Sequence, residues 1–348
     1  MSDVFIRTEG PVGRITLTRP KALNALNYGM CVAIDAALKG WRDDDAVALV
    51  LMDAEGPRAF CAGGDIAQIY HRGLAGDYDF GRRFWFDEYR MNARIAEYSK
   101  PVISLMQGFI MGGGVGLGGH ASHRIVGDTA QVSMPECGIG MIPDVGGSYL
   151  LARGPGQVGK YLGTTGARMG PGDAIFAGFA EHFVPEADWP ALVAALIDAG
   201  SPAPIDRLAQ TPPEGVLPTR MAVIDRHFAP DSAVAILNGL EGDGGDFATE
   251  TAQILRRASP LSVALTVEMQ VQQQAAPDLR RALIREHRAT WRIQETGDFL
   301  EGTRAAVIDK DRNPRWQHAR LDDVTQAEVA AMLAPLGPQD LTFEEERP

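Results

Sequence analysis

Two short, mainly apolar runs, the first of them unbroken, constrain the fold of this chain more than any other feature. They cover residues 47–52 and 101–106, and neither shows the regular polar alternation of a strand with one face in water. Such runs are typical of β-strands that are buried on both faces. Helical patterns at residues 30–38 and 84–98 precede them along the chain. Because strands and helices alternate in this way, the sequence predicts an α/β fold.

Shorter signals extend this alternation. Residues 12–18 alternate and are rich in β-branched side chains, so they predict a strand that ends at Arg19-Pro20. Asn27 stands where an N-cap is expected for the helix that follows. Further short strands are predicted at residues 124–126 and 131–134.

The second part of the chain has a different character. Helical patterns dominate from residue 158 onward, and Pro and Gly cluster at residues 200–215 and 239–245. Such clusters mark turns and seams between packed regions. We therefore expect a core in residues 1–200 and a C-terminal helical region in residues 201–348.

Composition excludes several function classes. The chain has 348 residues, with 33 Lys and Arg against 45 Asp and Glu, so its net charge is −12. This acidic balance lacks the electrostatic footprint of a nucleic-acid-binding protein. No run approaches the roughly 20 apolar residues that span a bilayer, so no membrane partner is expected. The N-terminus shows no secretory signal pattern, and three cysteines are too few and odd in number for a disulfide scaffold. We therefore expect a cytoplasmic location.

A glycine-dense segment follows the second apolar run. Gly114, Gly116 and Gly119 satisfy the spacing of the dinucleotide-binding fingerprint. Three interpretations are open: a dinucleotide site, a tight turn with close backbone packing, or a helix N-terminus that faces an anion or a developing oxyanion. The fingerprint stands alone, since no acidic ribose partner is evident on a following strand.

A second small-residue loop, Phe-Cys-Ala-Gly-Gly-Asp at residues 60–65, follows the first apolar run. Each loop could direct one backbone N–H at a ligand, and one donor from each could hold a single carbonyl oxygen. The loss of one such donor typically costs about 2.7–4 kcal/mol of transition-state stabilisation. The two loops together therefore indicate a site more strongly than either loop alone.

Two carboxylates, Glu136 and Asp144, lie in a Gly/Pro-framed loop at residues 134–147. They could be solvated surface charges, which is the usual state of carboxylates. Among apolar neighbours, however, a carboxyl group has a raised pKa and suits acid–base work. Glu88, on the helix predicted at 84–98, could be a surface charge or could close a pocket.

Other candidates are weaker. His120 and His123 have no third ligand at a useful spacing, so no metal site is predicted. Cys61 and Cys137 lack an evident paired histidine and are interpreted as small core residues. No serine lies in a Gly-x-Ser-x-Gly nucleophile elbow.

Several motifs together resemble the enoyl-CoA hydratase/isomerase (crotonase) superfamily. They are the loop Arg-Pro-Lys-Ala-Leu-Asn-Ala-Leu at residues 19–26 and the segments at 60–65, 111–116 and 134–147. Within the superfamily, the chain is most similar to the 3-hydroxyisobutyryl-CoA hydrolases. That similarity rests on residues 86–89, 134–136, 143–147 and 297–311. The resemblance covers nearly the whole chain.

The resemblance implies a spiral of ββα units that forms an acyl-CoA-binding catalytic core, followed by C-terminal helices. It implies an oxyanion hole from the N–H groups of Gly64 and Gly113, catalytic carboxylates at Glu136 and Asp144, and a substrate contact at Glu88. Coenzyme A, as part of the substrate and not a separate cofactor, would lie against two segments comprising Lys21, Ala22, Leu23, Ala62, Gly64, Asp65 and Ile66. A homo-oligomer is possible by the same resemblance.

One position separates the activities of the superfamily. Hydratases use two glutamates, and the position that matches the first is Gly116 in this chain. We therefore predict hydrolysis of a short 3-hydroxyacyl-CoA, most specifically 3-hydroxyisobutyryl-CoA in valine degradation. Attack by Glu136 through an anhydride and general-base activation of water both remain open. The alternatives are an enoyl-CoA isomerase or hydratase, a non-catalytic CoA-ester-binding protein, and an NAD-dependent dehydrogenase.

Overall fold

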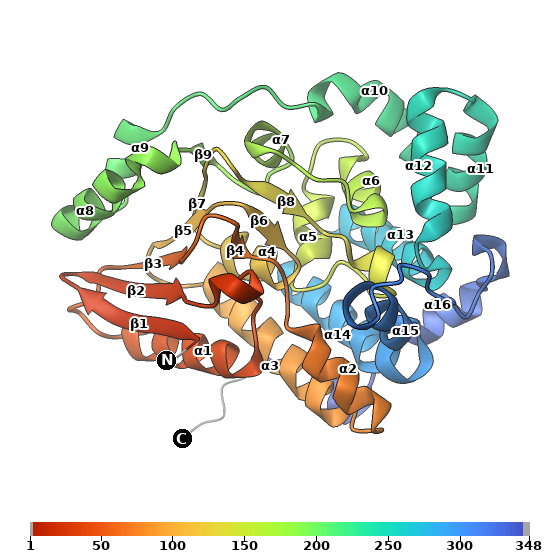
Figure 1. The fold of residues 1–348 in the computed structure, drawn as a ribbon, viewed down its shortest axis with the longest axis horizontal. Coiled ribbons are helices and arrows are strands. Elements are labelled where there is room, and N and C mark those ends of the chain that lie inside the picture. The colour runs from red at the N-terminus through yellow and green to blue at the C-terminus, as the bar shows by residue number, and fades with distance from the viewer. Residues whose placement is uncertain (1–2, 344–348) are drawn as a thin grey trace. The chain divides into compact units, whose positions relative to one another are not determined.

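The computed structural model describes residues 3–343 (Figure 1). These residues cluster into two compact units, each assembled from three separate stretches. The sheet unit comprises the chain up to residue 64, residues 91–133 and residues 168–219. The helical unit comprises residues 65–90, 134–167 and those from 220 onward. The units therefore interleave along the chain, whereas the predicted regions divide it once, at residue 200.

The larger sheet has six strands, which stand in the order β1-β2-β3-β5-β7-β9. These six strands form five neighbouring pairs. The pair β1–β2 is an antiparallel hairpin, and the other four pairs are parallel. The strands are β1 (Val4–Glu9), β2 (Val12–Leu17), β3 (Leu49–Ala54), β5 (Val102–Met106), β7 (His123–Val126) and β9 (His182–Phe183). The strands predicted at 12–18, 47–52, 101–106 and 124–126 are all present, within two residues of the expected ends. Two strands of this sheet, β1 and β9, were not predicted from the sequence.

A smaller parallel sheet contains β4 (Ala59–Cys61), β6 (Phe109–Met111) and β8 (Gln131–Ser133). Each pair of consecutive strands, β3–β4, β5–β6 and β7–β8, contributes one strand to each sheet. Helical segments follow each pair in the sequence, namely α2 (Ile66–Leu74) with α3 (Asp79–Ala96), α4 (Gly113–Gly118), and the 3-10 turn η2 (Glu136–Ile139). This repeated order confirms the predicted spiral of ββα units.

One face of the six-stranded sheet forms an apolar core with α8 (Trp189–Ala199) and α9 (Pro204–Leu208). The side chains that meet there alternate along the strands, as the two-residue period of a strand requires. They are Val12, Leu49, Leu51, Ile103, Leu105, Ile125, Val184, Leu192, Leu196 and Ile205. Each fully buried aliphatic side chain contributes roughly 1.5–3 kcal/mol, so this layer is a main source of stability of the sheet unit.

Helix α1 (Tyr28–Arg42) begins as predicted, because Asn27 caps it by accepting a hydrogen bond of 2.9 Å from the Met30 N–H. Its last turn packs closely on β2. A Cβ atom placed on Gly13 would lie 2.6 Å from the Trp41 ring, so only glycine fits at this point of the strand.

The helical unit contains most of the remaining helices. They are α5 (Gly147–Ala152), α6 (Val158–Thr165), α10 (Leu217–Phe228), α11 (Ala233–Asp243), α12 (Asp246–Arg257), α13 (Pro260–Ala275), α14 (Leu279–Thr296), α15 (Phe299–Thr303) and α16 (Gln326–Leu333). Two of them, α5 and α6, come from residues before position 201. α7 (Pro171–Phe176) belongs to the sheet unit. Between residues 3 and 343, no helix is both long enough and apolar enough to cross a membrane. The three cysteines are buried and carry free thiols.

Candidate active site

Two glycine loops leave the same edge of the smaller sheet, because they follow the parallel strands β4 and β6. They pack directly against each other. A Cβ on Gly114 would lie 2.0 Å from the Cys61 carbonyl oxygen, and one on Gly63 would lie 3.6 Å from that of Met111. Gly63 and Gly112 also have positive φ angles, +114° and +45°. Close packing therefore explains the glycine at position 114, the first of the dinucleotide fingerprint.

The same loops present two backbone N–H groups, those of Gly64 and Gly113, at the edge of the smaller sheet. Gly113 is the first residue of α4, where an N–H has no partner within the helix. Within residues 3–343, the N–H groups of Gly64 and Gly113 donate to no carbonyl or side chain. A pair of preorganised N–H groups at neighbouring loops is the arrangement that stabilises an oxyanion.

The loop at residues 19–26 is tied to the first glycine loop by two backbone hydrogen bonds. Ala62 N–H donates to Leu23 O over 3.0 Å, and Leu26 N–H donates to Gly63 O over 2.9 Å. Asn24 is fully buried and fixes this loop, since its Nδ2 donates to the carbonyls of Glu55 and Ala59, each at 2.9 Å.

The structure therefore brings together the predicted CoA-binding positions Leu23, Ala62 and Gly64, with Lys21 and Ala22 exposed beside them on the 3-10 turn η1 (Pro20–Ala22). Asp65 and Ile66 belong to the helical unit, where Asp65 is the N-cap residue of α2 and Ile66 is its first residue.

Among the described residues, the helical unit buries Asp298, which accepts a hydrogen bond from the Ser259 hydroxyl over 2.6 Å, and a cluster of four further acidic side chains. Glu88 lies on α3, Glu136 begins η2, Asp144 lies in the loop before α5, and Glu286 lies on α14. The Tyr89 hydroxyl donates to Asp144 Oδ2 over 2.6 Å. The first three acids are the predicted ones, and the structure buries them all.

Burial raises the pKa of every acid in this cluster. It raises the pKa of Glu136 and of Glu88 well above the usual value, and the charge of Asp144 adds to both shifts. The pKa of Asp144 rises to about 6, also through burial, against the opposing hydrogen bond from Tyr89. Among residues 3–343, Glu88 Oε1 and Glu136 Oε2 have no hydrogen-bond partner. Their buried oxygens can therefore hydrogen-bond a substrate or a water molecule.

Sequence reasoning missed Glu286 and the importance of Tyr89 and Ser148. Glu286 accepts hydrogen bonds from Gly146 N–H at 2.6 Å, from Ser148 N–H at 3.0 Å and from the Ser148 hydroxyl. Its pKa rises to about 8, chiefly through burial. One signal could have found it, because Glu286 shares the helix face of Leu283 and Ile293 and is thus a carboxylate on an apolar stripe.

A comparison with known protein families identifies the chain. The family model described as "Enoyl-CoA hydratase/isomerase" matches residues 12–333. The chain belongs to the enoyl-CoA hydratase/isomerase family. The superfamily predicted from the motifs is thereby confirmed.

Proteins that are similar to this chain carry three different names. The mitochondrial 3-hydroxyisobutyryl-CoA hydrolase of Gallus gallus is 37% identical, over 98% of this chain and 91% of the relative. The 3-hydroxyisobutyryl-CoA hydrolase 1 of Arabidopsis thaliana is 35% identical, over 94% and 90%. Among solved structures, one described as an enoyl-CoA hydratase from Rhodobacter sphaeroides is 58% identical, with a TM-score of 0.94 over 98% of this chain and 100% of its own. A carnitinyl-CoA dehydratase from Mycobacterium thermoresistibile is 41% identical, with a TM-score of 0.94 over 99% of this chain and 100% of its own.

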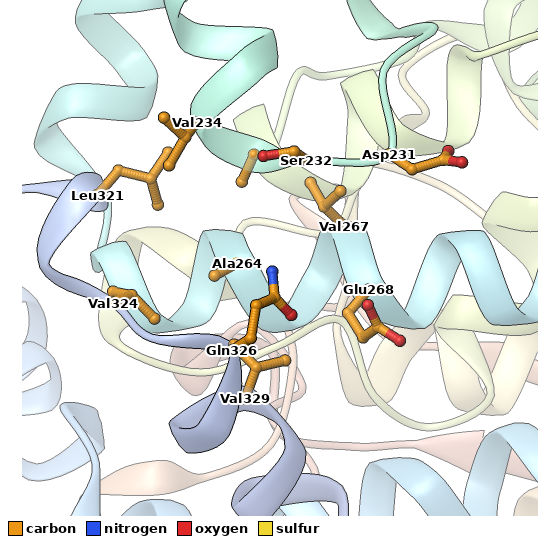
Figure 2. A pocket seen from close by; sticks show the side chains of 11 residues that line it. Asp231, Ser232, Val234, Ala264, Val267, Glu268, Leu321, Val324, Gln326 and Val329 are labelled. Atoms are coloured by element: carbon orange, nitrogen blue, oxygen red, sulfur yellow. The ribbon is translucent and has the colours of Figure 1, made fainter.

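The helical unit of this family member also contains a small pocket, which is too small for the proposed kind of substrate. A pocket among α11, α13 and α16, lined by Val234, Val267, Leu321 and Val329 among others, encloses about 30 Å³ (Figure 2). That volume holds a water molecule or two but no acyl-CoA. No group of three or more His, Cys, Asp or Glu side chains within residues 3–343 is arranged to hold a metal ion.

Proposed function

We propose that this family member hydrolyses a short 3-hydroxyacyl-CoA thioester, with 3-hydroxyisobutyryl-CoA as its substrate. The relatives from Gallus gallus and Arabidopsis thaliana, which match nearly the whole chain, are named for that reaction. The observation that carries the proposal is the buried pair Glu136 and Asp144, together with a Glu136 oxygen that has no hydrogen-bond partner in the described part of the chain. A carboxylate can support hydrolysis in two ways, by attacking the carbonyl carbon itself or by activating a water molecule.

The proposed reaction uses the backbone donors and the acids in succession. The thioester oxygen accepts hydrogen bonds from Gly64 and Gly113, which stabilise the charge that develops on it. Glu136 attacks the carbonyl carbon or activates a water to do so, and Asp144 orients that water. The C–S bond breaks, coenzyme A leaves with a proton, and water supplies the oxygen of the free acid. Glu88 accepts a hydrogen bond from the 3-hydroxyl group.

Coenzyme A would lie along Lys21, Ala22, Leu23 and Ala62, as part of the substrate. Two of these residues, Leu23 and Ala62, are joined by a backbone hydrogen bond, which supports one continuous binding edge. Water is the only other reactant, so the proposed reaction needs no separate cofactor.

Hydration of an enoyl-CoA is the second candidate, because the 58% identical structure is described as an enoyl-CoA hydratase. The two-glutamate hydration mechanism needs an acid where this chain has Gly116, a buried residue of α4. Glycine offers no side chain to polarise water, and this argues for hydrolysis.

The deciding experiment incubates the purified protein with 3-hydroxyisobutyryl-CoA, crotonyl-CoA or a 3-enoyl-CoA and follows thiol release with a reactive dye. Thiol release from the hydroxyacyl ester alone supports the hydrolase. A change in the crotonyl or 3-enoyl absorbance without thiol would mean a hydratase or an isomerase. Thiol-free binding of all three esters would mean a non-catalytic CoA-ester protein.

The variant Glu136→Gln should lose hydrolysis while it still binds the CoA ester, because the amide keeps the shape but cannot attack or take a proton. Binding is measured by calorimetry with the same ester. Wild-type turnover in this variant would remove Glu136 from the reaction.

A further inference from the structure

Glu286 differs from Glu88 and Glu136 in how its oxygens are used. Oε2 accepts the N–H of Gly146, and Oε1 accepts both the N–H and the hydroxyl of Ser148. The proposed reaction gives this acid no chemical step. Its three donors all come from the start of α5, which is 138–140 residues away in the sequence.

Those donors belong to the turn that carries Asp144, and the turn is strained. Val145 has φ +54°, a left-handed conformation that β-branched residues rarely adopt, and Gly146 follows with φ +79°. The Gly147 N–H donates to the Asp144 carbonyl over 2.6 Å, which closes the turn. Strained conformations persist only where the surroundings hold them. Here the surroundings include the carboxyl group of Glu286.

Asp144 is therefore held from two sides. Tyr89 on α3 donates to its Oδ2, and Thr290 lies 3.4 Å from the same Tyr89 hydroxyl. Glu286 on α14 holds the backbone two and four residues further on. Because Tyr89 donates to Oδ2, the other carboxyl oxygen of Asp144, Oδ1, is the one that could face a water molecule.

We propose that Glu286 is a positioning residue of the reaction, which fixes the strained turn at residues 144–147 so that Asp144 points its carboxyl group correctly. This inference rests on the proposed function, since it assumes that Asp144 orients the water molecule that hydrolyses the thioester.

The chemistry explains why a carboxyl group stands at this position. Backbone N–H groups only donate, so both oxygens of residue 286 must accept. Each oxygen of a carboxyl group can accept an N–H, whereas the nitrogen of a glutamine amide cannot. The variant Glu286→Gln therefore keeps the volume of the side chain and places an NH₂ group against a backbone donor.

The test is a cycle of four full-length proteins: wild type, Glu286→Gln, Asp144→Asn and the double variant. We expect kcat for hydrolysis of 3-hydroxyisobutyryl-CoA to fall about 100-fold in Glu286→Gln, the loss typical of a misplaced catalytic group, with KM little changed. In the Asp144→Asn background the same substitution should cause no further loss, because Glu286 acts through Asp144.

A merely structural role predicts a different result. Glu286→Gln would then lower activity by the same factor in both backgrounds, and this outcome overturns the proposal. The matched control is Arg288→Gln on the same helix, which breaks the pair with Asp340 and should leave kcat unchanged. A large loss of kcat in this control would mean that any disturbance of α14 has the effect, and would also overturn it.

Two further measurements cover other outcomes. If Glu286→Gln does not fold, Ser148→Ala removes one of the three donors, and a wild-type kcat in that variant overturns the proposal, while a smaller loss at constant KM supports it. If the wild-type protein releases no thiol, the proposed function fails. The crystal structure of Glu286→Gln then decides the inference: a displaced turn at 144–147 supports it and an unchanged turn overturns it.

Discussion

The replacement of Glu286 by glutamine should change how the stability of the protein depends on pH. The carboxyl group has a pKa of about 8 in the folded protein and 4.5 as a free side chain, chiefly because burial penalises its charged form. The folded protein therefore holds this proton more tightly than the unfolded chain does. The stabilisation from the proton is complete below pH 4.5 and is lost as the pH rises toward 8.

The magnitude follows from the two pKa values. Their separation is about 3.5 units, and one unit corresponds to about 1.36 kcal/mol. Wild type should therefore lose on the order of 5 kcal/mol of stability, relative to Glu286→Gln, between pH 4.5 and pH 8. Most of that loss falls between pH 5 and pH 8, because the folded protein still holds the proton there while the unfolded chain has released it.

The assay is urea unfolding of both proteins from pH 5 to pH 8, followed by the fluorescence of the five tryptophans. Glu295→Gln removes a half-exposed carboxyl group from the same helix and controls for the change in net charge. The difference between wild type and Glu286→Gln should shrink or reverse as the pH rises. A difference that stays constant over this range would refute the reasoning that Glu286 is protonated by burial.

Three further substitutions test other parts of the site. Gly114→Ala should destabilise the protein by at least about 1–3 kcal/mol in urea unfolding, since its Cβ would meet the Cys61 carbonyl at 2.0 Å; unchanged stability would contradict the close packing of the loops. Tyr89→Phe should lower kcat on the order of tenfold at constant KM, because it removes the 2.6 Å hydrogen bond to Asp144; a rise in KM alone would show that Tyr89 serves binding. Glu88→Ala should reduce kcat/KM for 3-hydroxyacyl-CoA more than for the plain acyl-CoA, and an equal loss on both would give Glu88 a structural role only.

The local and repeating features of the fold could be predicted from the sequence. Buried strands, the break at Pro20 and the Asn27 cap depend on neighbouring residues, so they leave a pattern in the sequence. The interleaving of the two units depends instead on which distant stretches pack together. Residues 134–167 follow the last strand of the small sheet directly, yet they cluster with residues 65–90 and with those from 220 onward. No local pattern carries that information.

The same distinction applies to the candidate site. Glu136 and Asp144 lie in a loop framed by glycine and proline, and such residues indicate an irregular turn in the sequence itself. Glu286 stands in an ordinary amphipathic helix, and its partner turn lies 138–140 residues away. The glycine fingerprint was ambiguous for a related reason, because close backbone packing and dinucleotide binding require the same residues. The structure resolves the ambiguity at position 114, because the Cys61 carbonyl lies so close to Gly114 that there is no room for a side chain.

The burial of these acids links the stability of the protein to its proposed chemistry. A carboxylate in water, with a pKa near 4.5, is too weak a base to take a proton from water efficiently, and a base works best when its pKa lies near the operating pH. Burial raises the pKa of Glu136 well above 4.5, and the nearby charge of Asp144 raises it further. Asp144, with a pKa of about 6, remains largely ionised at neutral pH and can keep that charge beside Glu136.

The desolvation that makes Glu136 a stronger base is the same effect that makes the buried cluster less stable as the pH rises. We therefore expect that substitutions which open the cluster to water will stabilise the protein at high pH and weaken its hydrolysis.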